Sequence, residues 1–238
     1  MEVKHSGNYD FKRSLERIDE ILNSDNKNFE ERDKIPSRNN LTFNNGYYVN
    51  VSAIFVDMRD SSSLTNSHKR STLAKIYRAF TSEVVAILNG SKNCVEINIV
   101  GDCVSGIFET HYQEDINELI DISARINSII KILNYKLEKK EFPKIKVGIG
   151  IDYGRSLMIK SGFKGNEIND VVWMGDVVNN ASKLSDKADN GIIYPVFISE
   201  SINTNLYKYI KNQFKRYNNN YCGNIVDTTM EKWYKNMI

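Results

Sequence analysis

The chain has 238 residues, of which 41% are hydrophobic and 26% are charged, and its formal net charge is +2. This length can bury one substantial core, and the nearly balanced charge provides no basic surface for nucleic acid or for an anionic membrane. Three cysteines without a CxxC pair, together with three scattered histidines, argue against a disulfide framework and against a zinc site.

The first residues, MEVKHSGNYD, lack the apolar core of a signal peptide. No stretch approaches the roughly 18 consecutive apolar residues that a membrane-spanning helix needs. We therefore expect a cytoplasmic protein with neither a membrane nor a nucleic acid as partner.

An N-terminal extension is predicted over residues 1–45, ahead of a main domain over 46–238. Its residues 9–23 form an amphipathic helix, because apolar side chains recur at helical spacing. The polar segment that follows is rich in Asn and charge and contains Pro36, which indicates a linker or a mobile arm. The apolar face of the helix has to pack against the main domain or against a second copy of the chain, and we favour the second copy.

The main domain is predicted to be an α+β fold with the ferredoxin-like order β-α-β-β-α-β. Runs of β-branched residues indicate the strands, and apolar residues three and four apart indicate the helices. A polar turn, RDSSSLTNSHKR, leads from the first strand into the first helix, for which Gly90 is a plausible C-cap. The strands are expected at 47–58, 94–100, 103–109 and 144–152, and the helices from Leu73 to Leu88 and over 113–140. Further elements follow: RSLMIKS, VVWMG, a helix from Asp176, the strand IIYPVFIS and a C-terminal helix.

Two aspartates are the first candidates for chemistry. Asp57 ends the first strand, and Asp102 lies at the tip of the hairpin between the two inner strands. The first and third strands are neighbours in this sheet order, so both carboxylates should converge at one edge. With no Lys or Arg between them in the apolar runs, they repel each other unless a cation bridges them, and Mg²⁺ and Mn²⁺ prefer such oxygen ligands. The alternative is that Asp57 caps the helix that follows it.

Two further motifs carry polar groups at helix positions. Ser61 and Ser62 lie at the start of a helix, where backbone N–H groups could hold a triphosphate, or where they form only a cap and a turn. Asn179 and Lys183 lie four residues apart on one helix face, and such a pair suits a ribose oxygen and a phosphate. The same pair on a solvated face would be ordinary.

Together the motifs resemble the class III nucleotidyl cyclases, the catalytic domain of adenylyl and guanylyl cyclases. The resemblance rests on FVDMRDSSSLT, INIVGDCVSGIF, VGIGIDYGRSLM and VWMGDVVNNASKL running into FISES, and it spans about residues 47–202. Each motif is short, but all four stand in the family's order on the expected elements.

The resemblance implies a homodimer whose two active sites lie at the interface, with two divalent cations, Mn²⁺ or Mg²⁺, at each. One subunit supplies the metal ligands and a phosphate-contacting Arg, and the other supplies the base pocket, a ribose-orienting Asn and a transition-state cation. Carried onto this sequence, the metal ligands are Asp57, the backbone carbonyl of Met58 and Asp102, and the other positions are Arg155, Asn179 and Lys183.

The sequence departs from the family in three places. Lys183 stands where the family usually has Arg, so the bidentate contact is lost. Asp60 and Ser61 replace the Gly and Phe of the phosphate loop. At the base-reading positions, Asn98 replaces the Lys of adenylyl or the Glu of guanylyl cyclases, and Val172 replaces Asp, Thr or Cys.

These substitutions disfavour a purine, because a base pocket that loses a polar partner loses discrimination. Asn98 can donate one hydrogen bond and accept another, which suits a pyrimidine edge, although it could also be a plain surface residue of its strand. The pattern is similar to the bacterial Pycsar pyrimidine cyclases. This similarity implies that UTP is converted to 3′,5′-cyclic UMP as an antiphage signal, read by an effector that binds the cyclic nucleotide.

The alternatives are a cytidylate cyclase, a divergent adenylyl or guanylyl cyclase, and a catalytically inactive module that senses nucleotide and dimerises. Loss of one metal aspartate would be the signature of the inactive module, and both aspartates are present.

Overall fold

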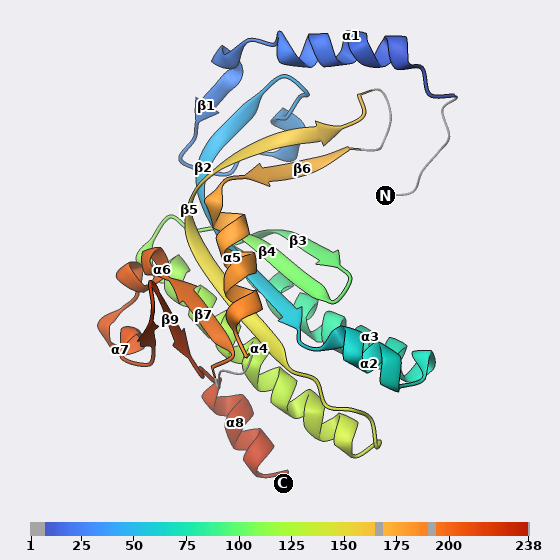
Figure 1. Cartoon of the computed structure of the whole chain (residues 1–238). Helices are drawn as coiled ribbons and strands as arrows, with labels where there is room; N and C mark the ends of the chain where they lie inside the picture. The colour runs from blue at the N-terminus through green and yellow to red at the C-terminus, as the bar shows by residue number, and fades with distance from the viewer. Residues whose placement is uncertain (1–7, 165–168, 190–193, 238) are drawn as a thin grey trace. The chain divides into compact units, whose positions relative to one another are not determined.

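The computed structural model describes residues 8–164, 169–189 and 194–237 (Figure 1). The chain forms two compact units, which are described separately. The larger unit contains Asn50–Gly154 and Asp176–Ile238, and the smaller unit contains Met1–Val49 and Arg155–Gly175. Two strands, β2 (Gly46–Met58) and β5 (Val147–Gly162), contribute residues to both units.

The larger unit is built on a sheet with the strand order β3-β4-β2-β5-β7-β9-β8. Strands β2, β3, β4 and β5 with helices α3 and α4 give the expected β-α-β-β-α-β order, and the α+β fold class is confirmed. The remaining bounds are β3 Cys94–Val100, β4 Cys103–Glu109, β7 Val196–Ser199, β8 Lys215–Tyr217, β9 Asn220–Gly223, α3 Arg70–Asn89 and α4 Gln113–Glu138.

Side-chain alternation assigns the two faces of this sheet. Ile54, Val56 and Met58 of β2 belong to the main core cluster together with the buried residues of α3 and α4. On β5 the odd-numbered residues from Val147 to Ile151 join the same cluster, so Gly148 and Gly150 lie on the opposite face. There they meet the backbone of α5 (Asp176–Lys187), which a Cβ on either glycine would strike.

Helix α3 has the expected apolar stripe, because its buried residues recur three and four positions apart. It ends at Gly90, whose N–H donates to carbonyls of the last turn as a C-cap. The stripe consists of Leu73, Ile76, Phe80, Val84 and Leu88.

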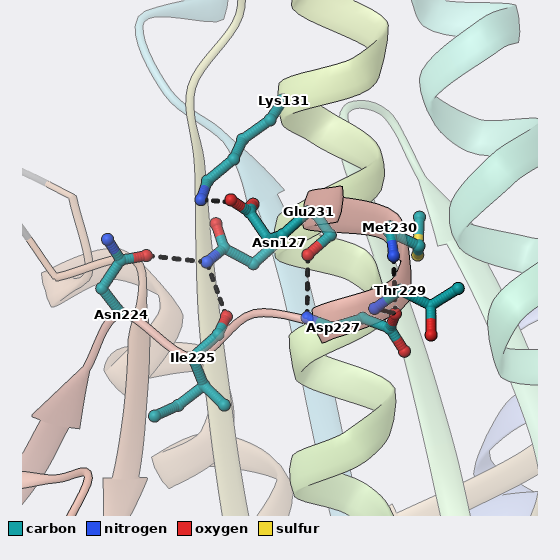
Figure 2. A network of polar contacts seen from close by, with 9 residues as sticks. Asn127, Lys131, Asn224, Ile225, Asp227, Thr229, Met230 and Glu231 are labelled. Atoms are coloured by element: carbon teal, nitrogen blue, oxygen red, sulfur yellow. Dashed lines mark hydrogen bonds and ion pairs between the residues drawn. The ribbon is translucent and has the colours of Figure 1, made fainter. Parts of the chain in front are cut away.

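A polar network fastens the C-terminal helix α8 (Thr228–Lys235) to α4 (Figure 2). Asn127 donates to the side-chain oxygen of Asn224 at 2.9 Å and to the carbonyl of Ile225 at 2.7 Å. Lys131 pairs with Glu231 at 2.6 Å. The Asp227 carboxylate accepts the N–H groups of Thr229 and Met230 and so caps α8.

The smaller unit has its own sheet segments. Strand β1 (Phe29–Glu31) runs parallel to the first residues of β2, and β6 (Asn169–Met174) pairs antiparallel with Leu157–Gly162 of β5. A small core joins Leu41, Tyr47 and Met158, with Ile35, Val171 and Trp173 packed against it. The polar segment of the extension therefore contributes a strand and, at Asn26–Asn28 and Arg38–Asn40, two 3-10 turns.

Helix α1 (Phe11–Leu22) forms where its apolar spacing predicts, and the Asp10 carboxylate caps it. None of its residues is buried, so its apolar stripe faces outward. Arg17 lies over the Phe163 ring and Glu20 pairs with Lys164, which connects α1 to the β5–β6 hairpin within the same unit.

Three local predictions need correction. The turn expected over RDSSSLTNSHKR is wrong for Ser61–Ser67, which form the short helix α2. The fourth strand does not end at Asp152, because β5 continues through RSLMIKS to Gly162 as one strand. Of the predicted strand IIYPVFIS, Val196–Ser199 form β7, and Ile192 and Ile193 lie outside the described residues.

The C-terminal part also contains short helices that the sequence interpretation did not place, α6 (Glu200–Asn205) and α7 (Lys208–Lys211), next to the β8–β9 hairpin. No helix in the described part of the chain combines the length and the apolar character needed to cross a bilayer.

Candidate active site

Asp57 and Asp102 are brought together by strand pairing. Strands β2 and β4 are antiparallel, and Asp57 lies directly opposite Cys103. The N–H of Met58 donates to the carbonyl of Asp102 at 3.3 Å. Burial raises the pKa of the Asp57 carboxyl above its usual range, Arg59 lowers it, and the charges of Asp102 and Asp186 raise it further. The two carboxylates therefore interact electrostatically, as the sheet order predicts.

The hairpin between β3 and β4 explains why the order Gly-Asp is used. Val100 pairs with Cys103, so Gly101 and Asp102 form a two-residue loop. Gly101 has φ 62°, and a positive φ at the first loop position is the pattern of a type II′ turn, which favours glycine there. The second position is then free to carry a functional side chain, and Asp102 occupies it.

The alternative role of Asp57, as a helix cap, is wrong. The residue before α2 is Asp60, in the left-handed conformation with φ 55°, and its side chain makes no capping hydrogen bond. Asp60 stands where the class III cyclases that the sequence resembles have Gly, and Gly is the residue that adopts the left-handed conformation at least cost. Ser61 and Ser62 begin α2, next to the strand end that carries Asp57.

The Asp57–Asp102 pair has the donor chemistry of a magnesium or manganese site, because it offers two carboxylates and the charge of Asp102 disfavours the ionised form of Asp57. In the described ranges no group of three or more His, Cys, Asp or Glu side chains is placed to hold an ion. The pair therefore fits a divalent cation that completes its ligand shell with backbone, water and substrate oxygens.

Asn98 lies on the same sheet face as Asp57. It pairs across the strands with Ser105, and Cys103, two residues along β4, pairs with Asp57. Cross-strand partners share a face, and residues two apart on a strand do so as well. The face opposite the α3–α4 core thus carries both the carboxylate and the predicted base reader.

Glu96 fixes the orientation of the Asn98 amide. The Asn98 Nδ2 donates to a Glu96 carboxylate oxygen at 2.8 Å. Glu96 is buried on β3, with 8% of its surface exposed, and Asn98 is half-buried. Because an ionised carboxylate only accepts hydrogen bonds, the amide nitrogen has to face Glu96. This hydrogen bond orients the Asn98 amide, and the base-reading role of Asn98 stays a prediction.

Helix α5 carries Asn179 and Lys183, both exposed, on the side away from the sheet. Its buried residues Val177, Ala181 and Leu184 pack toward the sheet. A Cβ on Gly150 would lie 2.1 Å from the carbonyl oxygen of Ala181, so α5 rests directly on the backbone of β5. Within the described residues, no hydrogen bond or ion pair links Asn179 or Lys183 to Asp57 or Asp102 of the same chain.

Arg155 and Val172 belong to the smaller unit. The Arg155 guanidinium donates from Nε to a Glu31 carboxylate oxygen at 2.9 Å, and its Nη2 donates to the same oxygen. The guanidinium carbon Cζ lies 3.6 Å from the centre of the Tyr48 ring. Val172 lies on β6 opposite Ile159 and is 41% exposed.

Two charged residues at the site were missed from the sequence, Arg59 and Glu96. The apolar runs between the aspartates contain no Lys or Arg, but Arg59 lies just beyond the first of them and its Nη1 is 3.3 Å from Asp57 Oδ2. Its position two residues after Asp57, where the chain leaves the sheet, was the available signal. Glu96 could have been found from its place two residues before Asn98, since such residues share a strand face.

Comparison with known proteins gives consistent matches. The family model described as "Adenylate and Guanylate cyclase catalytic domain" matches residues 43–223. The chain is 45% identical over 216 residues to a uridylate cyclase of Gulbenkiania mobilis, covering 87% of this chain and 83% of that protein. It is 41% identical over 203 residues to a uridylate cyclase of Treponema porcinum, covering 85% of this chain and 71% of that protein. In fold it is similar to the adenylyl cyclase CyaB from P. aeruginosa, with a TM-score of 0.60 at 17% identity, over 74% of this chain and 93% of that one.

Proposed function

This chain belongs to the class III nucleotidyl cyclases, the adenylate and guanylate cyclase family, and within it we propose that the protein converts UTP into 3′,5′-cyclic UMP and pyrophosphate. The observation that carries the proposal is the meeting of Asp57 and Asp102 at the ends of paired strands, in a chain whose relatives are named uridylate cyclases.

Class III cyclases use divalent metal ions, and the aspartate pair is where this chain would hold them. Asp57, Asp102 and the backbone carbonyl of Met58 are the proposed ligands of two cations, Mn²⁺ or Mg²⁺. When bound, the cations supply a lowered pKa for the ribose 3′-hydroxyl and positive charge for the triphosphate.

The proposed reaction is intramolecular. The ribose 3′-oxygen forms a bond to the α-phosphorus, the bond from this phosphorus to the bridging oxygen breaks, and pyrophosphate leaves while the hydroxyl proton passes to solvent. The chain positions the reactants and stabilises charge and needs no covalent nucleophile. Lys183 and Arg155 meet the phosphate charge, Asn179 orients the ribose, and Ser61 and Ser62 lie where the triphosphate would be held.

The preference for a pyrimidine rests on Asn98. Its Nδ2 carries two hydrogens, and one of them goes to Glu96. One N–H and the side-chain oxygen remain for a base, and they match the O4 acceptor and the N3–H donor of uracil. Val172 adds an apolar contact without a hydrogen bond.

Turnover of the four nucleoside triphosphates tests the proposal. We expect the purified protein with Mn²⁺ to make cyclic UMP from UTP and to leave ATP and GTP intact. Asp57→Asn and Asp102→Asn should each abolish product formation while the far-ultraviolet circular dichroism stays unchanged. Cyclic CMP as the main product would identify a cytidylate cyclase, and turnover of ATP or GTP a purine cyclase. No product from any of the four, with nucleotide still bound, would identify the inactive sensing module.

The biological part of the proposal is an antiphage signal. Cyclic UMP made in the cytoplasm by a homodimer with sites at the interface would activate an effector with a cyclic-nucleotide-binding part. Neither nucleic acid nor a membrane takes part. Cells that carry the cyclase and its effector should survive phage challenge, and cells with the Asp57→Asn enzyme should not. Equal survival of both would contradict the antiphage role.

A further inference from the structure

We propose that Arg59 is a positioning residue for this reaction, because it fixes the Asp57 carboxylate by tying it to the last turn of α5. The inference deepens the proposed function and rests on it, since it assigns Asp57 to the metal site.

The Arg59 guanidinium reaches two elements at once. Its Nη1 lies 3.3 Å from Asp57 Oδ2 and 3.9 Å from Asp186 Oδ1. Its Nη2 donates to the backbone carbonyl of Ser185, in the last turn of α5. One planar group thus contacts the end of β2 through Nη1 and the end of α5 through both Nη atoms.

The surroundings hold Arg59 in one place. Its side chain is 12% exposed, and its backbone N–H donates to the carbonyl of Lys146 at 2.9 Å. A Cβ on Gly148 would lie 2.2 Å from Nη2, so the absence of a side chain on β5 provides the room that the guanidinium occupies. The buried Nε has no hydrogen-bond partner among the described residues, so the two Nη atoms supply the side chain's polar contacts.

This geometry favours positioning of Asp57 over a simple surface ion pair. An ionised carboxylate has about four lone-pair sites, and a single guanidinium nitrogen near Oδ2 leaves most of them for a cation. Partners that contact metal ligands from behind orient them, and their loss typically costs 10–100-fold in metal affinity or activity. A Lys at this position would keep the charge, but its single nitrogen cannot reproduce the fork that joins Asp57 to Ser185.

A rival role is that Arg59 merely occupies the cation's place and competes for Asp57. The two roles predict opposite changes in metal affinity. If Arg59 positions Asp57, its removal weakens metal binding, and if Arg59 competes, its removal strengthens it. The anchoring by Ser185 and Lys146, both outside the aspartate pair, supports positioning.

The test measures Mn²⁺ binding to the nucleotide-free protein, by electron paramagnetic resonance of the free ion, for the wild type, Arg59→Lys and Arg59→Gln. Arg125→Gln is the matched control, because Arg125 also pairs with an aspartate in the larger unit, Asp227, but away from the aspartate pair. We expect Mn²⁺ binding to weaken about 10–100-fold in both Arg59 variants and to stay unchanged in the control. Circular dichroism establishes that each variant is folded, and Arg59→Lys keeps the charge if Arg59→Gln does not fold.

Kinetics separate positioning from a structural role. In the Arg59 variants the Mn²⁺ concentration for half-maximal turnover should rise about as much as the dissociation constant, the KM for UTP at saturating Mn²⁺ should change little, and Arg59→Lys should not restore the wild-type value. Unchanged or tighter Mn²⁺ binding in the variants, or no Mn²⁺ binding by the wild type, would overturn the inference. A wild type that binds Mn²⁺ through Arg59-dependent contacts but turns over no UTP would overturn the proposed function and leave only the positioning of Asp57 for the metal ion standing.

Discussion

At the scale of single residues, the hydrogen bond between Asn98 and Glu96 gives the site a fixed direction. A carboxylate accepts and never donates, so it forces the amide nitrogen of Asn98 toward Glu96 and the amide oxygen away. Uracil presents an acceptor at O4 and a donor at N3, and cytosine presents the reverse, so the choice between them depends on where the second N–H and the oxygen of this amide point. Glu96 therefore acts on specificity through Asn98.

Glu96→Gln should relax this choice. A Gln side chain can donate as well as accept, so the Asn98 amide could turn, and a charge-assisted hydrogen bond becomes a weaker neutral one. We expect the ratio of kcat/KM for UTP to that for CTP to fall about tenfold, which corresponds to about 1.4 kcal/mol. Glu83→Gln, on the exposed side of α3, is the control and should leave the ratio unchanged. An unaltered ratio in Glu96→Gln would show that Asn98 does not read the base.

The thiols of Cys94 and Cys103 should resist alkylation. Burial raises the pKa of Cys94 to about 11 and, together with the charges of Asp57 and Asp102, the pKa of Cys103 to about 12. Only the thiolate reacts, so at pH 8 about one Cys94 in a thousand is reactive, and its labelling rate should rise about tenfold from pH 8 to pH 9. Mass spectrometry after iodoacetamide treatment measures this, with protein unfolded in urea as the fast reference. Rapid labelling of Cys94 in the folded protein at pH 7 would contradict the shift.

The proximity of Asp57 and Asp102 was predictable, because the order of the strands in the sheet decides which strand ends meet. The spacing of Arg59 and Glu96 places both residues near the site, but the direction of their side chains was not predictable, for a physical reason. Whether a charged side chain turns toward a site or toward solvent depends on the packing of a second element, here α5 for Arg59, and local sequence does not contain that information.

At the scale of secondary-structure elements, α5 lies unusually close to β5. Two glycines, Gly148 and Gly150, leave the strand bare where the helix crosses it, and the helix backbone occupies the space. This contact sets the height of α5, and thereby the positions of Asn179 and Lys183, relative to the sheet.

Gly150→Ala tests the role of this contact. The added Cβ would lie 2.1 Å from the Ala181 carbonyl oxygen and 2.2 Å from the Ser185 nitrogen, and both are backbone atoms that cannot move separately from α5. We expect a loss of about 1–3 kcal/mol in the free energy of unfolding and a large loss of turnover, measured by urea denaturation and the UTP assay. Gly90→Ala, at a C-cap with φ −72°, is the matched control and should stay near wild type. Wild-type stability and turnover in Gly150→Ala would show that α5 has room to shift.

Elements whose periodicity is long and regular were predicted well, and α3 and α4 are the clearest cases. The short elements were not, because α2 is a helix of seven polar and small residues with only Leu64 as an apolar residue. β5 was divided in two because Tyr153 and Gly154 interrupt its apolar pattern, although the backbone stays extended through them.

At the scale of the whole molecule, the proposed homodimer predicts that two inactive variants restore each other. Asp57→Asn removes a metal ligand and Lys183→Ala removes the proposed transition-state cation, and in the proposed dimer these groups reach a given site from different subunits. A mixed dimer then has one site with both defects and one intact site. The purified mixed dimer should give about half of wild-type turnover, because one of its two sites works.

The assay is UTP turnover after the two inactive proteins are coexpressed with different affinity tags and the mixed dimer is purified. Asp57→Asn paired with Asp102→Asn is the control, because both defects then fall on the same half of a site and no site in the mixed dimer is intact. Activity in the control equal to that of the test pair, or none in the test pair, would contradict shared sites.

The composition of the smaller unit has a consequence for anyone who shortens the gene. The smaller unit takes its residues from the N-terminal segment and from Arg155–Gly175. A shortened protein that starts at Gly46 would therefore keep the β5–β6 hairpin but lack Ile35 and Leu41. Met158, Val171 and Trp173 would then lose their apolar cover, and overexpression would deliver inclusion bodies in place of a minimal enzyme. A reporter protein should therefore be fused to the chain with residues 1–45 kept, and should not replace them.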